Sequence, residues 1–67
     1  MVVKLISKWG DVLKEYYSSI NTDIPMVDDT VVVAGEKYKV VNRTFDVDTY
    51  SAIVEVWKVV EDNNGLV

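Results

Sequence analysis

Carboxylates at two places in the chain have the spacing for acid–base chemistry or metal binding. Asp46 and Asp48 are separated by one residue, and a connecting segment carries Asp23, Asp28 and Asp29. A calcium loop needs several oxygen ligands at fixed spacing together with a glycine and a later glutamate, and this pattern is missing here. Aspartates that bind nearby backbone amides are typical of turns. We therefore predict turn residues and no metal site at both places.

Histidine and cysteine are absent from the chain. The commonest general base, the commonest metal ligand and any thiol nucleophile are therefore excluded. No nucleophile–base spacing and no glycine-rich loop for phosphate is present either. The sequence predicts a protein that is not an enzyme, with no catalytic residues, no cofactor and no small-molecule substrate.

Large aromatic side chains are the best candidates for binding. The chain has two Trp and four Tyr residues among 67. Each large aromatic needs about 150–250 Å² of covering area, so a domain this small cannot bury them all. Aromatic residues also supply much of the binding energy at protein interfaces. We predict a partner-binding surface made of Trp9, Tyr16, Tyr17 and Trp57. The alternative is that Trp57 closes one end of a barrel and Trp9 caps a turn.

The charge balance argues against several partners. The formal net charge is −4, from 11 acidic and 7 basic residues, whereas nucleic-acid-binding proteins usually present a basic face. No apolar run approaches the roughly 20 residues that span a bilayer, and the N-terminus lacks the pattern of a signal peptide. We expect no nucleic-acid partner, no membrane partner and a cytoplasmic location.

The central part of the chain predicts a β-hairpin. Residues 30–34 form a β-branched run, and residues 37–45 begin with strict alternation of polar and apolar side chains. A tight turn at Gly35-Glu36 joins them. The alternation shifts phase after Val40, which predicts a β-bulge near Val41-Asn42. A turn at 46–49 then leads to a strand at 51–60.

Residues 2–20 fit two interpretations. As a helix they place apolar side chains at i, i+3 and i+4 spacing, but Gly10 would lie in mid-helix, where glycine costs about 1 kcal/mol relative to alanine. As a hairpin they form strands 2–8 and 12–17 with a turn at Trp9-Gly10-Asp11, which uses the freedom of glycine at positive φ. The sequence favours the hairpin slightly.

The segment from Pro25 to Thr44 resembles small SH3-like β-barrel domains. The matching residues are Pro25, Val27-Asp28-Asp29, Val31, Val33, Gly35, Tyr38 and Val40. The chain departs from the pattern at Asp28, where the pattern has glycine. Residues 4–60 also resemble, in layout, short uncharacterised proteins of tailed bacteriophages and prophages. These resemblances imply no catalytic residues, and they imply the cytoplasm of a bacterial host as the location.

The expected fold is mainly β, a small antiparallel SH3-like barrel or meander of about five strands. The alternative is an α+β fold with a helix at 2–20 on a three-stranded antiparallel sheet. One domain spans 1–67, with 1–60 folded and 61–67 a frayed tail. The predicted core consists of Leu5, Val31, Val33, Tyr38, Val40, Phe45, Val54 and Val56.

Three functions from different classes follow as hypotheses. The first is a small protein-binding module, which the phage resemblance would make a modulator of a host protein. The second is a homo-oligomeric structural component of a phage assembly, in which the same apolar faces bind other copies. The third is an acidic inhibitor that mimics nucleic acid.

Overall fold

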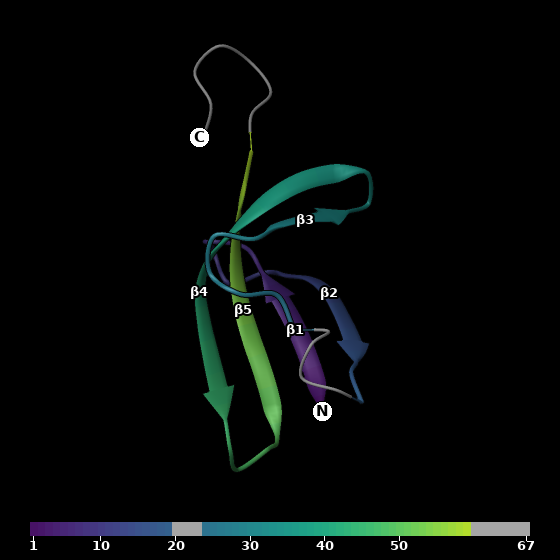
Figure 1. Cartoon of the computed structure of the whole chain (residues 1–67), viewed down its shortest axis with the longest axis vertical. Coiled ribbons are helices and arrows are strands. Elements are labelled where there is room, and N and C mark those ends of the chain that lie inside the picture. Colours follow the sequence, from purple (N-terminus) through teal and green to yellow (C-terminus); the bar gives the residue numbers. More distant parts are fainter. Residues whose placement is uncertain (20–23, 60–67) are drawn as a thin grey trace.

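The protein forms one five-stranded sheet that curls into a half-barrel (Figure 1). The computed structural model describes residues 1–19 and 24–59. The strands run in the spatial order β2-β1-β5-β4-β3. Their bounds are β1 Val2–Ile6, β2 Val12–Tyr17, β3 Thr30–Val33, β4 Glu36–Asp46 and β5 Ser51–Lys58.

The mainly-β prediction is confirmed, and the five strands lie within a few residues of their predicted positions. Residues 2–17 form the hairpin β1–β2, so the helical alternative is wrong. The purely antiparallel meander is also wrong, because β1 pairs with β5 in parallel. β2 therefore lies at one edge of the sheet and β3 at the other. The predicted tail at 61–67 and the last residue of the predicted strand at 51–60 lie outside the described residues.

The turn between β1 and β2 depends on a glycine. Gly10 has φ +88°, a left-handed conformation in which other residues are strained. The Gly10 amide donates to the Ser7 carbonyl at 3.0 Å, and the Ser7 amide donates to the Asp11 carbonyl at 2.8 Å. The Ser7 hydroxyl also accepts from the amides of Trp9 and Asp11. A three-residue loop that ends in a left-handed glycine is a common hairpin connection, and it places Lys8 and Trp9 at the tip.

The central hairpin turns one residue earlier than predicted. Its loop residues are Ala34 and Gly35, with φ +51° and +80°, and Val33 pairs with Glu36. Positive φ at both loop positions defines a type I′ turn, whose twist matches that of the flanking strands. The predicted turn at Gly35-Glu36 is wrong because a two-residue loop of this type needs both of its residues at positive φ.

The predicted bulge is present in β4. Val40 pairs with Val56 and Asn42 pairs with Glu55, so Val41 has no partner on β5. Val40 also bonds to the segment before β3, since its carbonyl accepts from the Asp28 amide and its amide donates to the Asp29 carbonyl. The bulge increases the local twist of β4. Residues 36–39 of β4 pair with β3, and residues 38–46 pair with β5.

The core lies on the inner face of the half-barrel. Among the described residues, eight apolar ones are buried: Met1, Val3, Leu5, Ile24, Val40, Ala52, Val54 and Val56. The predictions for Leu5, Val40, Val54 and Val56 are thus confirmed, while Val31, Val33 and Tyr38 pack against the core half-buried. Phe45 is a wrong prediction, because its side chain is 46% exposed.

The Phe45 side chain lies on the predicted face of the sheet, but the apolar side chains of the core do not bury it. It pairs with the buried Ala52, so both side chains lie on the same face of the sheet. At this end of β4 the Arg43 guanidinium lies 5.1 Å from the centre of the Phe45 ring. A cation and open solvent therefore replace the apolar cover that a core residue would have. In the described residues, no helix is long and apolar enough to cross a membrane.

Candidate functional site

Two of the four predicted partner-binding residues meet around one lysine. The Lys8 ammonium lies 5.0 Å from the centre of the Trp9 ring and 5.4 Å from the centre of the Trp57 ring. Both distances are within the range of cation–π attraction. Lys8 and Trp9 come from the β1–β2 turn, and Trp57 comes from β5, which lies beside β1. We call Lys8, Trp9 and Trp57 the tryptophan cluster.

The tryptophan cluster is open to solvent. Trp9 is 78% exposed and Trp57 is 37% exposed. The indole nitrogen of Trp57 donates to a Glu55 carboxylate oxygen at 2.8 Å, which fixes the orientation of the ring. The pairing of β1 with β5 thus decides the cluster, because it brings together aromatic residues that are far apart in the chain.

The other two predicted residues lie elsewhere on the hairpin. Tyr16 pairs with Val3 and packs against the core half-buried. Tyr17 pairs with Val2 and is 75% exposed. Both lie at the end of β2 that is remote from the turn holding Trp9. The structure therefore does not bring Tyr16 and Tyr17 together with the tryptophan cluster.

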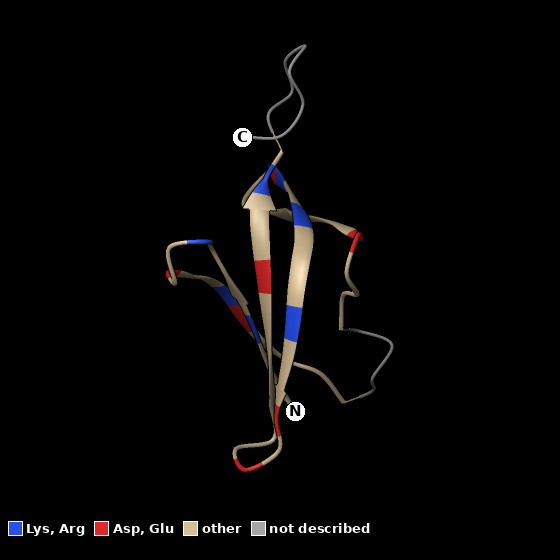
Figure 2. Ribbon diagram, turned by 90° about the vertical axis from the view of Figure 1, so that its left-hand side faces the viewer, with Lys and Arg blue, Asp and Glu red and all other residues tan. Residues whose placement is uncertain are grey.

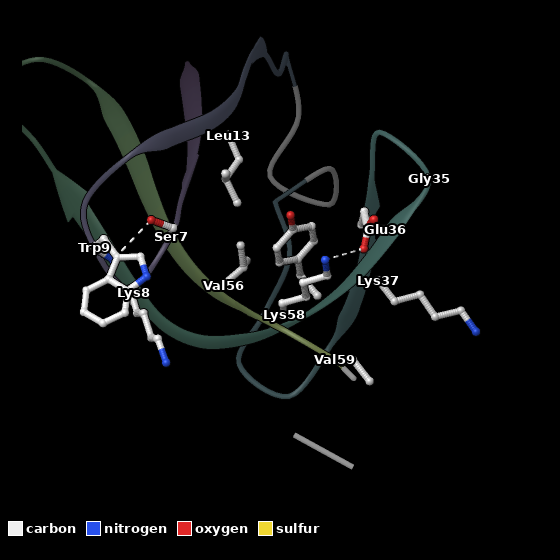
Figure 3. A pocket seen from close by; sticks show the side chains of 11 residues that line it. Ser7, Lys8, Trp9, Leu13, Gly35, Glu36, Lys37, Val56, Lys58 and Val59 are labelled. Carbon is white, nitrogen blue, oxygen red and sulfur yellow. Dashed lines mark hydrogen bonds and ion pairs between the residues drawn. The ribbon is translucent and has the colours of Figure 1, made fainter. Parts of the chain in front are cut away.

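A hollow of about 870 Å³ adjoins the tryptophan cluster. The β1–β2 turn contributes Lys8 and Trp9 to one side, and the β3–β4 hairpin contributes Glu36 to the other (Figure 3). Leu13 and Val56 point into the space between these two sides (Figure 3). A hollow of this size falls in the range of binding pockets in proteins.

An ion pair forms the far wall of this hollow. The Lys58 ammonium lies 2.9 Å from a Glu36 carboxylate oxygen (Figure 3). This hydrogen bond, together with the charge of Glu36, raises the pKa of Lys58 above its ordinary value. Both side chains are about half exposed, so the pair orients the hairpin end and stabilises the fold only weakly.

A second, smaller hollow of about 390 Å³ continues along the same gap. Its lining includes Leu5 and Lys14 on one side and the strand residues Val31–Val33 on the other. Both hollows lie between the same two edge elements, because each is lined by residues of β2 and of the β3–β4 hairpin. We call the two hollows together the edge groove, since it separates the edge strands β2 and β3.

Two of the loop carboxylates, Asp46 and Asp29, accept hydrogen bonds from nearby backbone amides. An Asp46 carboxylate oxygen accepts from the amides of Asp48 and Thr49 at 3.0 and 3.3 Å, which confirms the predicted turn. An Asp29 carboxylate oxygen accepts from the Met26 amide at 2.9 Å. Asp28 has φ +78°, a conformation that favours glycine. Glycine is the residue that the SH3-like sequence pattern has at this position.

Asp23 lies outside the described residues. Among residues 1–19 and 24–59, no group of three or more acidic, histidine or cysteine side chains could hold a metal ion.

Lys8, which links the two tryptophans, was not among the predicted binding residues, and of the described residues that line the edge groove only Trp9 and Tyr16 were. The common origin of the tryptophan cluster and the groove is the pairing of β1 with β5, and a pairing between segments so far apart leaves no local pattern. The only local signal was the position of Lys8 beside Trp9, at the end of the predicted strand 2–8.

Comparisons with known proteins add no family to this description. No family model, no curated protein and no solved structure matches the chain.

Proposed function

We propose that this protein is a non-enzymatic protein-binding module that contacts its partner through the tryptophan cluster. The observation that carries the proposal is the position of Trp9, which is 78% exposed at a hairpin tip. Tryptophan is among the residues most enriched at the energetic centres of interfaces. A small domain gains nothing in stability from a large apolar ring that remains in water, and the fold does not need Trp9 for its core.

The surroundings of Trp9 suit a protein partner. Lys8 lies against both tryptophan rings, and the hollow beside them is lined by apolar and charged side chains together. Interfaces combine such apolar anchors with a polar rim. The absence of histidine and cysteine, and the use of Asp46 in a turn, support a binding role over catalysis.

The test is affinity purification from extracts of the source cells, with quantitative mass spectrometry of wild type and Trp9→Ala. We expect the partner enriched by the wild type to fall about 30-fold or more with Trp9→Ala, because hot-spot residues contribute 2 kcal/mol or more. Val47→Ala is the matched control, since Val47 is also exposed but lies in the β4–β5 turn. Equal capture by wild type and Trp9→Ala, both folded, would refute the proposal.

A homo-oligomeric structural component is the second candidate, supported by the two edge strands. Val12 on β2 and Val32 on β3 are both mainly exposed. Exposed apolar edge strands are templates for pairing with another chain. Light scattering of the purified protein separates the candidates, because a monomer favours the binding module and a defined dimer or ring favours the structural component.

A further inference from the structure

The two edges of the half-barrel leave backbone groups available for pairing. β2 and β3 are the two ends of the strand order, and each has one neighbouring strand among the described residues. In a hairpin with a two-residue loop, the residues beside the loop exchange both hydrogen bonds and the next residue points its backbone groups outward. With Val33 paired to Glu36, the amides and carbonyls of Thr30 and Val32 therefore face away from β4.

The charged side chains along the edge groove are mainly cationic. Within the part of the chain that the structure describes, its lining contains the basic residues Lys8, Lys14, Lys37 and Lys58 and one acidic residue, Glu36. Asp46 and Asp48 lie at the turn between β4 and β5, at the bottom of Figure 2 and away from the groove. A chain of net charge −4 thus places an excess of positive charge at the gap between its sheet edges.

We infer that the edge groove binds an extended acidic segment of a protein partner, which adds to the sheet as a further strand beside β3. This inference rests on the proposed function and specifies the chemistry of the partner. The backbone groups of Thr30 and Val32 supply the pairing, which is the usual basis of affinity when a peptide extends a sheet. Lys8 and Lys14 supply the selection for acidic side chains, since opposite charges across an interface favour the correct partner.

A short acidic segment fits better than the other possible occupants. A second copy of the chain would bring its own Lys8 and Lys14 against those of the first copy, and like charges across an interface are unfavourable. A nucleic acid would extend beyond the groove over a protein whose net charge is −4. A peptide strand satisfies both the backbone groups of β3 and the lysines.

The test is an NMR titration of the full ¹⁵N-labelled chain. The probe is a six-residue peptide of alternating Glu and Val with blocked ends. We expect amide shifts along β2 and β3 and slower hydrogen exchange at Thr30 and Val32. The same peptide with Lys in place of Glu should bind about ten-fold more weakly or worse. Absence of binding, equal binding of both peptides, shifts confined to β1 and β5, or tighter binding of a six-nucleotide thymidine strand would each overturn the inference.

Two pairs of variants separate backbone pairing from charge. Val32→Pro removes an outward amide, which an edge strand tolerates, and should abolish binding, whereas Val32→Thr keeps the amide and should bind as the wild type does. Lys8→Gln with Lys14→Gln should weaken the Glu peptide about five- to ten-fold, while Lys4→Gln, outside the groove, should not. Unchanged binding in Val32→Pro or in the double lysine variant would contradict the inference.

Failure of the inference about the edge groove can be distinguished from failure of the proposed function. If the partner is captured by Val32→Pro and lost only with Trp9→Ala, the protein is a binding module whose partner does not add a strand beside β3. If no variant affects capture, both the groove and the proposed function are wrong.

Discussion

Replacing Ala34 by asparagine should stabilise the protein, because Ala34 occupies a left-handed position in the type I′ turn. Its φ is +51°, and an L-residue with a Cβ pays about 1–2 kcal/mol there. Asparagine tolerates this conformation through local hydrogen bonds of its short side chain, and Asn-Gly is the preferred pair for this turn. Ala34 is exposed, so the larger side chain displaces no core residue. We expect a gain of about 0.5–1 kcal/mol in the free energy of unfolding.

The assay is thermal and urea unfolding followed by circular dichroism. A gain of this size should raise Tm by about 2–8 °C in a domain of this length. Gly35→Ala is the matched control. Nothing lies within 4 Å of the Cβ that alanine would add at Gly35, so its cost comes from φ +80° alone. We expect a loss of about 1–2 kcal/mol. An unchanged or lowered Tm for Ala34→Asn would refute the assignment of the turn to residues 34 and 35.

Three further outcomes test the core, the exposed surface and the ion pair. Val56→Ala should lower the free energy of unfolding by about 1–3 kcal/mol, because it removes buried apolar surface and leaves a cavity. Val32→Ala should lower it by less than about 1 kcal/mol, because Val32 is mainly exposed. Similar losses for the two variants in urea unfolding would contradict the assigned core. Tyr17→Ala should leave the circular dichroism spectrum and the cooperative melt intact because the ring is mainly exposed, and an unfolded variant would show that Tyr17 belongs to the core. The raised pKa of Lys58 means that its pairing with Glu36 stabilises the fold at neutral pH and is lost as the pH rises through that pKa. Raising the pH above about 10 should therefore lower the free energy of unfolding of wild type more than that of Lys58→Gln, as measured by urea unfolding. If the free energies of both proteins change with pH in parallel, the pair contributes nothing to stability.

The positions of the strands could be predicted because their signals are local. Alternation predicted the start of β4, the change of phase after Val40 predicted the bulge, and Gly10 and Gly35 marked the first and second hairpins. The turn at Ala34-Gly35 was misplaced by one residue because alanine carries no preference for positive φ. Only the geometry of the paired strands imposes that conformation on it.

The exposure of the aromatic residues could be predicted from the sequence, but their grouping in space could not. Composition alone predicted that some aromatics must lie outside so small a core, and Trp9 and Tyr17 are indeed mainly exposed. Which aromatics lie together was not predictable, since Tyr17 is adjacent to Tyr16 in sequence but remote from Trp9 in the fold. The relevant distances depend on strand pairing over about 50 residues.

The sequence by itself predicted the central hairpin, the bulge and the last strand, and it slightly favoured a hairpin over a helix for residues 2–20, because a period of two and a left-handed glycine act over a few residues. Only the tertiary structure decided what covers each face. Phe45 lies on the inner face but at an end that Arg43 and solvent occupy, whereas Ala52 on the same face is fully buried. The parallel pairing of β1 with β5 likewise left β2 and β3 as edges and opened the groove between them. Burial and grooves are properties of elements that meet in space, and no local pattern contains them.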